Sequence, residues 1–488
     1  MISVTAPQWV GILIGFWIGF AASMWGMSNP ESIIRLARWK DRLFLDCISI
    51  AGPIAIFTLY GLHAYGFGMH FGLKDFYVWG ILIGGAFFGA GMAISGYFPG
   101  SEWMALGEGR RDAVYAIPAG LLGALAWTLL SATEIGHWLV NAGNMGQILI
   151  SGKTVEATST STILLVAIPF SLALLAIAWL VPRYPEIPIA PLTAQLKSIP
   201  GHSDDNPILR ARRDDTAAYL LEGSIAQKNS FAVKIARNFT SEPNTFSITH
   251  IGIAVSIGLT VVLGLFLHQI FGESTTYSWI VSFMAPSIEY SKITQATVGW
   301  EPFSDLGTYL GGFCAATLLS KRYTAFRKIV PPSWQNRFGS SQLLRACGVF
   351  VGSFMVLFGA RMAGGCASGH IMSGTFQMAA SGVLFAAAVL ISMRITASLV
   401  YGKTSEKLVK TVHPATSNTI SATTSESAML VPLTIAGVIL TIMIAAWATK
   451  GATGYAPEGS AWVISLIVPW FMALLAFSYY TDKPPYQG

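Results

Sequence analysis

The chain has 488 residues, of which 53% are hydrophobic and 11% are charged, and its mean hydropathy is +0.56. Ordinary soluble proteins carry roughly 25% charged residues, so this composition excludes a soluble enzyme and indicates an integral membrane protein. The net charge of +6 does not indicate a nucleic-acid partner, because the basic residues collect in loops between apolar segments.

Apolar runs of membrane-spanning length recur along the chain. About 20 helical residues cross a hydrocarbon core of roughly 30 Å, so we expect an all-α, polytopic fold of about 9–11 transmembrane helices. The N-terminus has no basic region before its first apolar run, and we expect no cleaved signal peptide. The expected spans are 8–27, 43–62, 77–96, 113–131, 161–181, 248–271, 303–320, 342–361, 379–400, 429–449 and 461–479.

The third span runs into a glycine-rich interruption, GYFPGSEWMALGEGRR at 96–111. Bilayers tolerate irregular backbone only where protein or water covers it, so this break indicates a re-entrant loop that faces a cavity. Close helix packing is the alternative explanation for such glycines. The charged residues at 108–112 are either paired at the inner mouth or solvated. The residues expected at the constriction are Phe98, Pro99 and Gly100.

Two polar stretches are expected to be linkers. Residues 182–247 have mixed charge and little hydrophobic periodicity, so we expect a cytoplasmic loop there. This loop would join an N-terminal membrane half, 1–181, to a C-terminal membrane half, 248–488. Residues 411–428 are rich in serine and threonine and form the second expected linker.

Lysine and arginine predict which loops face the cytoplasm. With eleven spans, all the basic loops fall on one side, as in an oriented multi-pass protein; the membrane that we expect to hold it is the bacterial inner (plasma) membrane. The expected inside loops are 28–42, 182–247, 321–345 and 401–410, and the expected outside loops are 132–160 and 272–302.

The strongest motif is GARMAGGCASGHIMSG at 359–374. Packing alone does not require a thiol, a hydroxyl and an imidazole, so we expect a second break, antiparallel to the first, that meets it near mid-depth. Backbone N–H groups at such breaks favour anions. A charge within a span costs roughly 2.5 to 3.5 kcal/mol or more, so the arginine should contact water, an acid or the substrate. The expected binding residues are Arg361, Gly364, Gly365, Cys366, Ser368, Gly369 and His370.

The cysteine spacing offers no C-x-x-C and no metal-ligand pattern, so we expect no disulfide, metal or other cofactor. Cys366 and His370 stand four residues apart. A thiol activated by imidazole and an inert thiol beside a packing histidine are both open. Cys47, Cys314 and Cys347 are expected to be small apolar fillers.

At these residues the chain resembles the YeeE/YedE family of transporters. Segment 359–382 is similar to the family signature, close to G-x-R-x-G-G-G-C-T/A-S-G-H followed by S-G, and GAGMAISGYFPG at 89–100 resembles the first family loop. GILIGFWIGFAASMWGMSNP at 11–30 resembles the first family helix. The resemblance implies a sulfur-compound permease, typified by thiosulfate uptake, in which two re-entrant loops meet in an hourglass and cysteine thiols pass the anion along.

The chain departs from the family pattern at two places. Phe98 stands where the family loop usually has cysteine, and Met24 and Met27 stand in the first helix, where members often carry another cysteine. Only Cys366 of the usual relay remains. We therefore expect a permease for a small inorganic sulfur-containing anion, with Cys366 as the substrate-contacting thiol and no covalent chemistry on the substrate.

Two other functions remain as alternatives. A non-transporting membrane anchor or subunit of a sulfur or redox enzyme complex would pack an apolar outside surface, on 132–160 or 272–302, against another chain. A permease would have a continuous polar path through Cys366. A membrane enzyme that uses Cys366 and His370 lacks a third orienting residue at a recognisable spacing. The bilayer is the expected surrounding, and a partner protein or a homo-oligomer is left open.

Overall fold

The computed structural model describes residues 6–179, 248–316 and 330–402, apart from positions 41, 68 and 298. Within these ranges the protein is all-α, as predicted, and has no β-strand. Outside the described residues lie the predicted linkers 182–247 and 411–428, most of the basic loop 401–410, and the predicted spans 429–449 and 461–479.

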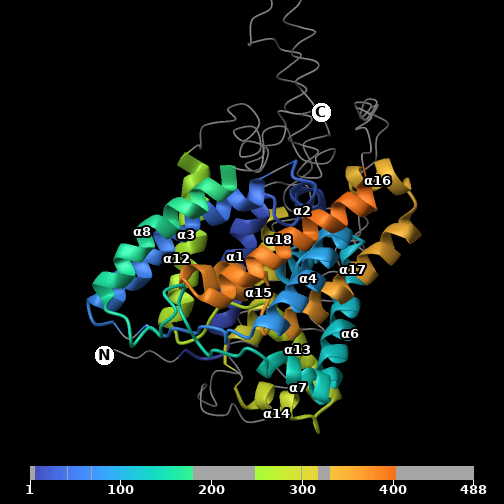
Figure 1. Ribbon diagram of the computed structural model, residues 1–488. Helices are drawn as coiled ribbons and strands as arrows, with labels where there is room; N and C mark the ends of the chain where they lie inside the picture. The colour runs from blue at the N-terminus through green and yellow to red at the C-terminus, as the bar shows by residue number, and fades with distance from the viewer. Residues whose placement is uncertain are drawn as a thin grey trace, which may run out of the picture.

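Long helices cross the molecule, and shorter elements lie at its ends and at its centre (Figure 1). The long helices are α1 (Val10–Trp25), α3 (Leu43–Ala64), α4 (Val78–Ser95), α6 (Ala113–Ser131), α8 (Thr160–Trp179), α12 (Ile248–Phe266), α17 (Gln342–Met362) and α18 (Ala380–Tyr401). The shorter elements are α2 (Pro30–Ala37), α5 (Pro99–Gly107), α7 (Glu134–Asn141), α13 (Ser274–Met284), α14 (Glu289–Ala296), the 3-10 turn η1 (Glu301–Phe303), α15 (Ser304–Cys314), α16 (Pro332–Phe338) and the π-helix η3 (Ala367–Gly374).

Five helical segments of the described residues are long and apolar enough to cross a membrane, which makes this a multi-pass membrane protein. The bounds of four segments follow the predicted spans closely, because apolar length determines both, whereas the segment Val78–Gly107 runs past the predicted span 77–96 and includes α5. Shorter apolar helices lie at 10–23, 161–177 and 253–266. The five segments are Leu43–Ala64, Val78–Gly107, Ala113–Ser131, Gln342–Met362 and Ala380–Tyr401.

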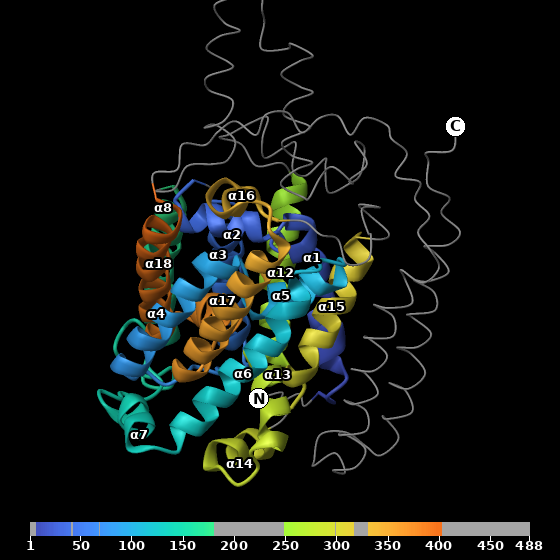
Figure 2. The ribbon, with the colours of Figure 1, turned by 90° about the vertical axis from the view of Figure 1, so that its right-hand side faces the viewer.

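The short helices at the two ends agree with the grouping that the basic residues predict. Helices α2 and α16 lie at one end of the molecule, and α7 and α14 lie at the other (Figures 1 and 2). The first pair belongs to the predicted inside loops 28–42 and 321–345, and the second pair to the predicted outside loops 132–160 and 272–302.

Small residues bring helices from distant parts of the chain into backbone contact. A Cβ on Gly15 of α1 would stand 1.8 Å from the carbonyl oxygen of Ser304, and one on Gly307 of α15 would stand 2.0 Å from that of Ile12. Helix association in lipid depends on such close approach, because apolar side chains gain little by leaving a hydrocarbon solvent. Packing is therefore the role of Gly307.

The prediction of an outside loop at 272–302 is wrong in its first third. Residues Ser274–Met284 form α13, whose polar side chains are largely buried. They are buried because their hydroxyls bond inside the protein: Tyr277 donates to Glu102 at 2.6 Å, and Thr276 donates to the carbonyl of Pro302 at 2.7 Å. The polar residues that suggested a loop are therefore part of the core.

Candidate functional site

The first glycine motif breaks between α4 and α5. Phe98 is extended, and its N–H donates to Ser101 Oγ at 2.8 Å. Pro99 then begins α5, where the N–H that proline lacks would have had no helical partner. A Cβ on Gly100 would stand 1.8 Å from the Glu273 carboxyl group, so only glycine lets the start of α5 approach that group.

A buried ionic network holds this break at the end of the molecule that carries α2. Asp112 accepts hydrogen bonds from Arg345 at 2.9 Å and from Arg110 at 3.0 Å. Tyr97 also donates to Asp112, at 2.9 Å, and Arg345 donates to the Ser95 carbonyl at 2.6 Å. Burial opposes ionisation, yet the two guanidinium groups hold the pKa of Asp112 at about 2. Pairing is thus the observed alternative for this charged segment.

The second motif breaks between α17 and η3. Gly364 has φ of +81°, a left-handed conformation that favours glycine, and a Cβ there would stand 2.4 Å from Tyr77 Oη. Cys366 is fully buried, and its Sγ lies 3.1 Å from Ser368 Oγ. That same hydroxyl accepts the N–H of Glu273 at 3.0 Å. Ser368 therefore connects the thiol to the residue that the first break contacts.

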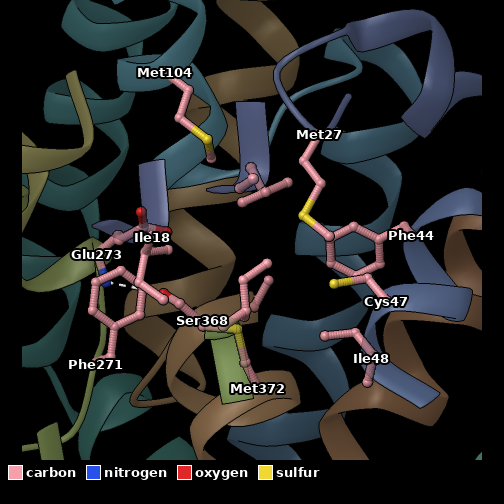
Figure 3. A pocket seen from close by; sticks show the side chains of 14 residues that line it. Ile18, Met27, Phe44, Cys47, Ile48, Met104, Phe271, Glu273, Ser368 and Met372 are labelled. Carbon is pink, nitrogen blue, oxygen red and sulfur yellow. Dashed lines mark hydrogen bonds between the residues drawn. The ribbon is translucent and has the colours of Figure 1, made fainter. Parts of the chain in front are cut away.

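Both breaks line one small cavity, which Figure 3 shows from close by. Phe98 lines it from the first motif and Ser368 from the second, and Glu273 lies between them. The volume is about 30 Å³, on the scale of one or two ordered water molecules. Four sulfur-bearing side chains line the cavity: Met27, Met104, Met372 and Cys47.

His370 packs against the backbone of the second break. Its ring is fully buried, stacks on Phe385 at a centroid distance of 4.8 Å and places Nε2 2.9 Å from the Ala363 carbonyl. A Cβ on Gly365 would meet this ring at 3.0 Å. Within the described ranges, no hydrogen bond joins the imidazole to the Cys366 thiol. This geometry favours the packing histidine over an activated thiol.

Arg361 lies away from the cavity. Its guanidinium is half-buried and donates to Tyr290 Oη of α14 and, at 3.1 Å, to Ser274 Oγ of α13. Contact with water, an acid or the substrate was expected; the hydrogen-bond partners are two hydroxyl groups instead, and Arg361 lines neither cavity. A Cβ on Gly369 would meet nothing closer than the Gly272 Cα at 4.0 Å, an ordinary contact, so packing does not require glycine there.

A second, open cavity of about 530 Å³ reaches the second break from the end that carries α7 and α14. We call it the vestibule. His70, Lys74 and His268 line it together with two acidic side chains, and Gly364 forms part of its wall. Burial and the neighbouring His268 and Lys74 lower the pKa of His70.

Three residues at this site were not among those predicted from the sequence. Cys47 was expected to be a filler, yet it lines the cavity. Glu273 follows an apolar helix and a glycine, which is the one signal that could have drawn attention to it. Asp305 is fully buried on α15, and neither of its carboxyl oxygens has a hydrogen-bond partner among the described residues. No group of three or more His, Cys, Asp or Glu side chains in the described part could hold a metal ion.

Comparison with known proteins adds one finding. The family model described as sulphur transport matches residues 38–395. The matched segment contains both glycine breaks, Glu273 and Cys47. No curated protein matches the chain.

Proposed function

The chain belongs to the YeeE/YedE family of sulphur transporters, and we propose that it is a permease for a small sulfur-containing anion such as thiosulfate. The anion would enter through the vestibule, pass the loop at Cys366 and cross the cavity between the two glycine breaks. Such a path is the hourglass that the sequence resemblance implies. No covalent step on the substrate is part of the proposal.

The position of Cys366 carries the proposal. Gly364 lines the vestibule and Ser368 lines the cavity, and Cys366, which lines neither, lies on the short loop between these two residues. An anion that moves from one space to the other has to displace this loop and pass the thiol. Arg361 and His370, which lie outside both linings, would act by supporting the loop rather than by touching the anion.

The chemistry of the loop suits a soft, weakly held anion. Thiosulfate is a dianion with a terminal sulfur, for which a neutral S–H group, the Ser368 hydroxyl and backbone N–H groups are weak partners. Conduction requires binding that admits the ion and does not trap it. Thioethers are polarizable and adaptable, and Cys47 would supply a second thiol in a chain that has Phe98 in the family's cysteine position.

The observed state is closed. A cavity of about 30 Å³ holds roughly one or two water molecules, so the loop has to open before an anion can enter. The second motif continues as the π-helix η3, and π-helical turns are often placed at functional sites. Buried ionic contacts at Asp112 would keep the opposite end shut meanwhile.

The orientation follows from the basic loops. We place the end that carries α2 and α16 in the cytoplasm of a bacterial inner membrane. The linker 182–247 would then join the two membrane halves, 1–181 and 248–488, on the cytoplasmic side.

A second candidate is the non-transporting anchor of a sulfur or redox enzyme complex. Large apolar side chains are exposed at the end that carries α7 and α14, including Ile135 (63%), Met284 (61%) and Ile293 (54%). A partner subunit would cover them, and so would the lipid boundary of a permease. Transport measurements separate the two functions.

The test is uptake of labelled thiosulfate, sulfite or sulfide into vesicles that contain the purified protein, against empty vesicles. We expect uptake of at least one anion by the native protein and its loss in Cys366→Ala. Cys347→Ala is the matched control, because Cys347 is exposed on α17, and it should transport normally. A native protein that moves none of the three anions would refute the sulfur permease and leave the anchor.

A further inference from the structure

Glu273 lies where the two glycine breaks meet. Its side chain is 1% exposed and lines the cavity. The carboxyl group lies against Gly100 at the start of α5, and Thr308 of α15 donates to Oε1 at 3.2 Å. Its own N–H is fixed by Ser368, as the dashed line in Figure 3 shows. An anion that crosses the cavity therefore passes beside this carboxyl group.

No basic side chain neutralises Glu273 among the described groups that face it. Arg361, on the neighbouring end of α17, binds Ser274 and Tyr290 instead. The polar groups near Glu273 are acids, hydroxyls and a thiol: Asp305 and Thr308 of α15, Ser368 of the second break, Cys47 of α3 and Tyr277 of α13. Glu102 of α5 and Cys366 lie within coulombic range of Asp305.

Two further buried carboxyl groups would add negative charge to the same apolar space if they were ionised. Glu102 and Asp305 are both fully buried, and Asp305 lies within coulombic range of Glu273 and Cys366. Charges removed from water need a counter-ion, or the group takes up a proton. A passing anion would place one more negative charge in this apolar space. Neutral carboxyl groups are the arrangement that lets an anion through.

We propose that Glu273 binds one proton for each anion that crosses the cavity, so that transport is a proton–anion symport. The inference rests on the proposed transport function and adds its coupling ion. The proton comes from water in the vestibule and forms the O–H bond of the carboxyl group while the anion is present. After the anion leaves, water from the α2 end reaches the carboxyl group and takes up the proton, and no bond of the anion is made or broken. The hydroxyl of Thr308 can donate to the carboxylate or accept from the acid, so it serves both states.

The experiment uses full-length protein in liposomes, with the membrane voltage clamped by potassium and valinomycin. Thiosulfate is the probe because it stays a dianion near neutral pH and does not leak across lipid as a neutral acid. An inward gradient of one pH unit should raise its accumulation about tenfold at one proton per anion. An internal pH dye should report acidification with each addition of thiosulfate.

The variants locate the proton site. Glu273→Gln keeps the shape of the side chain and should abolish the response to the pH gradient, measured as the ratio of uptake with and without it. Glu273→Asp retains a carboxyl group and should keep that ratio, which covers the case in which the glutamine variant is inactive. Glu289→Gln, at an exposed carboxylate on α14, is the matched control and should behave like the native protein.

Three outcomes would contradict the proton coupling or its assignment to Glu273. Native uptake without acidification or gradient response would overturn the symport and leave the permease intact. A Glu273→Gln protein that keeps the tenfold response would place the proton elsewhere and overturn the assignment to Glu273. Absence of native uptake of thiosulfate, sulfite and sulfide alike would overturn the transport function and, with it, the symport.

Discussion

Substitution Gly100→Ala tests the contact between the first glycine break and Glu273. The new Cβ would stand 1.8 to 1.9 Å from the carboxyl atoms of Glu273, whereas real Cβ contacts are essentially never shorter than 3.0 Å. The start of α5 or the carboxyl group must therefore move by more than an ångström. Overpacking of a fitted core costs about 1–3 kcal/mol, so we expect a lower unfolding temperature together with loss of uptake.

A second substitution at Glu273 distinguishes this clash from a general folding defect. Ala at position 273 removes the carboxyl atoms that the new methyl group meets, so Gly100→Ala combined with Glu273→Ala should recover the stability that Gly100→Ala loses. The control is Gly61→Ala in α3, where a Cβ meets nothing within 4 Å, and it should be neutral or stabilising by up to about 1 kcal/mol. Thermal unfolding in detergent measures all four proteins. A Gly100→Ala protein as stable and active as the native one would refute the geometry.

Three further predictions concern the thiol, the ionic network and the vestibule. Cys47→Ala should lower thiosulfate uptake roughly fivefold, the equivalent of one hydrogen bond of about 1 kcal/mol. The control is Cys314→Ala, at a thiol buried outside the cavity lining, which should transport normally. Equal uptake rates in the two variants would contradict a second thiol on the path. Asp112→Asn should destabilise the protein by about 3–5 kcal/mol, because two buried guanidinium groups lose their shared carboxylate. The pKa of Asp112 is about 2 in the folded protein and 3.8 ordinarily, so its contribution is complete above about pH 5 and is lost progressively as pH falls to about 1. Unfolding temperatures of native and variant proteins that stay equally far apart from about pH 5 down to about pH 2 would refute this linkage. Lys74→Gln should slow uptake about tenfold at low ionic strength and less at high salt, and a salt-independent loss would argue against steering in the vestibule.

Much of the fold could be predicted because membrane spans are determined by apolar length. Residues 113–131 are helical as predicted, and the break at Gly364 follows from a left-handed backbone that only glycine adopts readily. The break at 96–100 was predicted from the same type of signal.

The core of the site could not be predicted, because it depends on contacts between distant segments. Glu273 and the polar residues after it have the composition of a loop, and only the approach of Ser368 and Gly100 makes their position a site. Cys47 precedes no recognisable motif, and its thiol reaches the cavity because α3 packs beside it. The spacing of residues in the sequence does not indicate the contacts of Glu273 or the position of Cys47 at the cavity.

The most direct test of the central claim is an experimental structure of the protein with thiosulfate bound. The account predicts the anion on the loop between the vestibule and the cavity, within hydrogen-bond distance of Cys366 Sγ or Ser368 Oγ, and the loop displaced from the closed arrangement. Thiosulfate bound away from both cavities, with Gly364 to Ser368 unchanged and the thiol still enclosed, would contradict it.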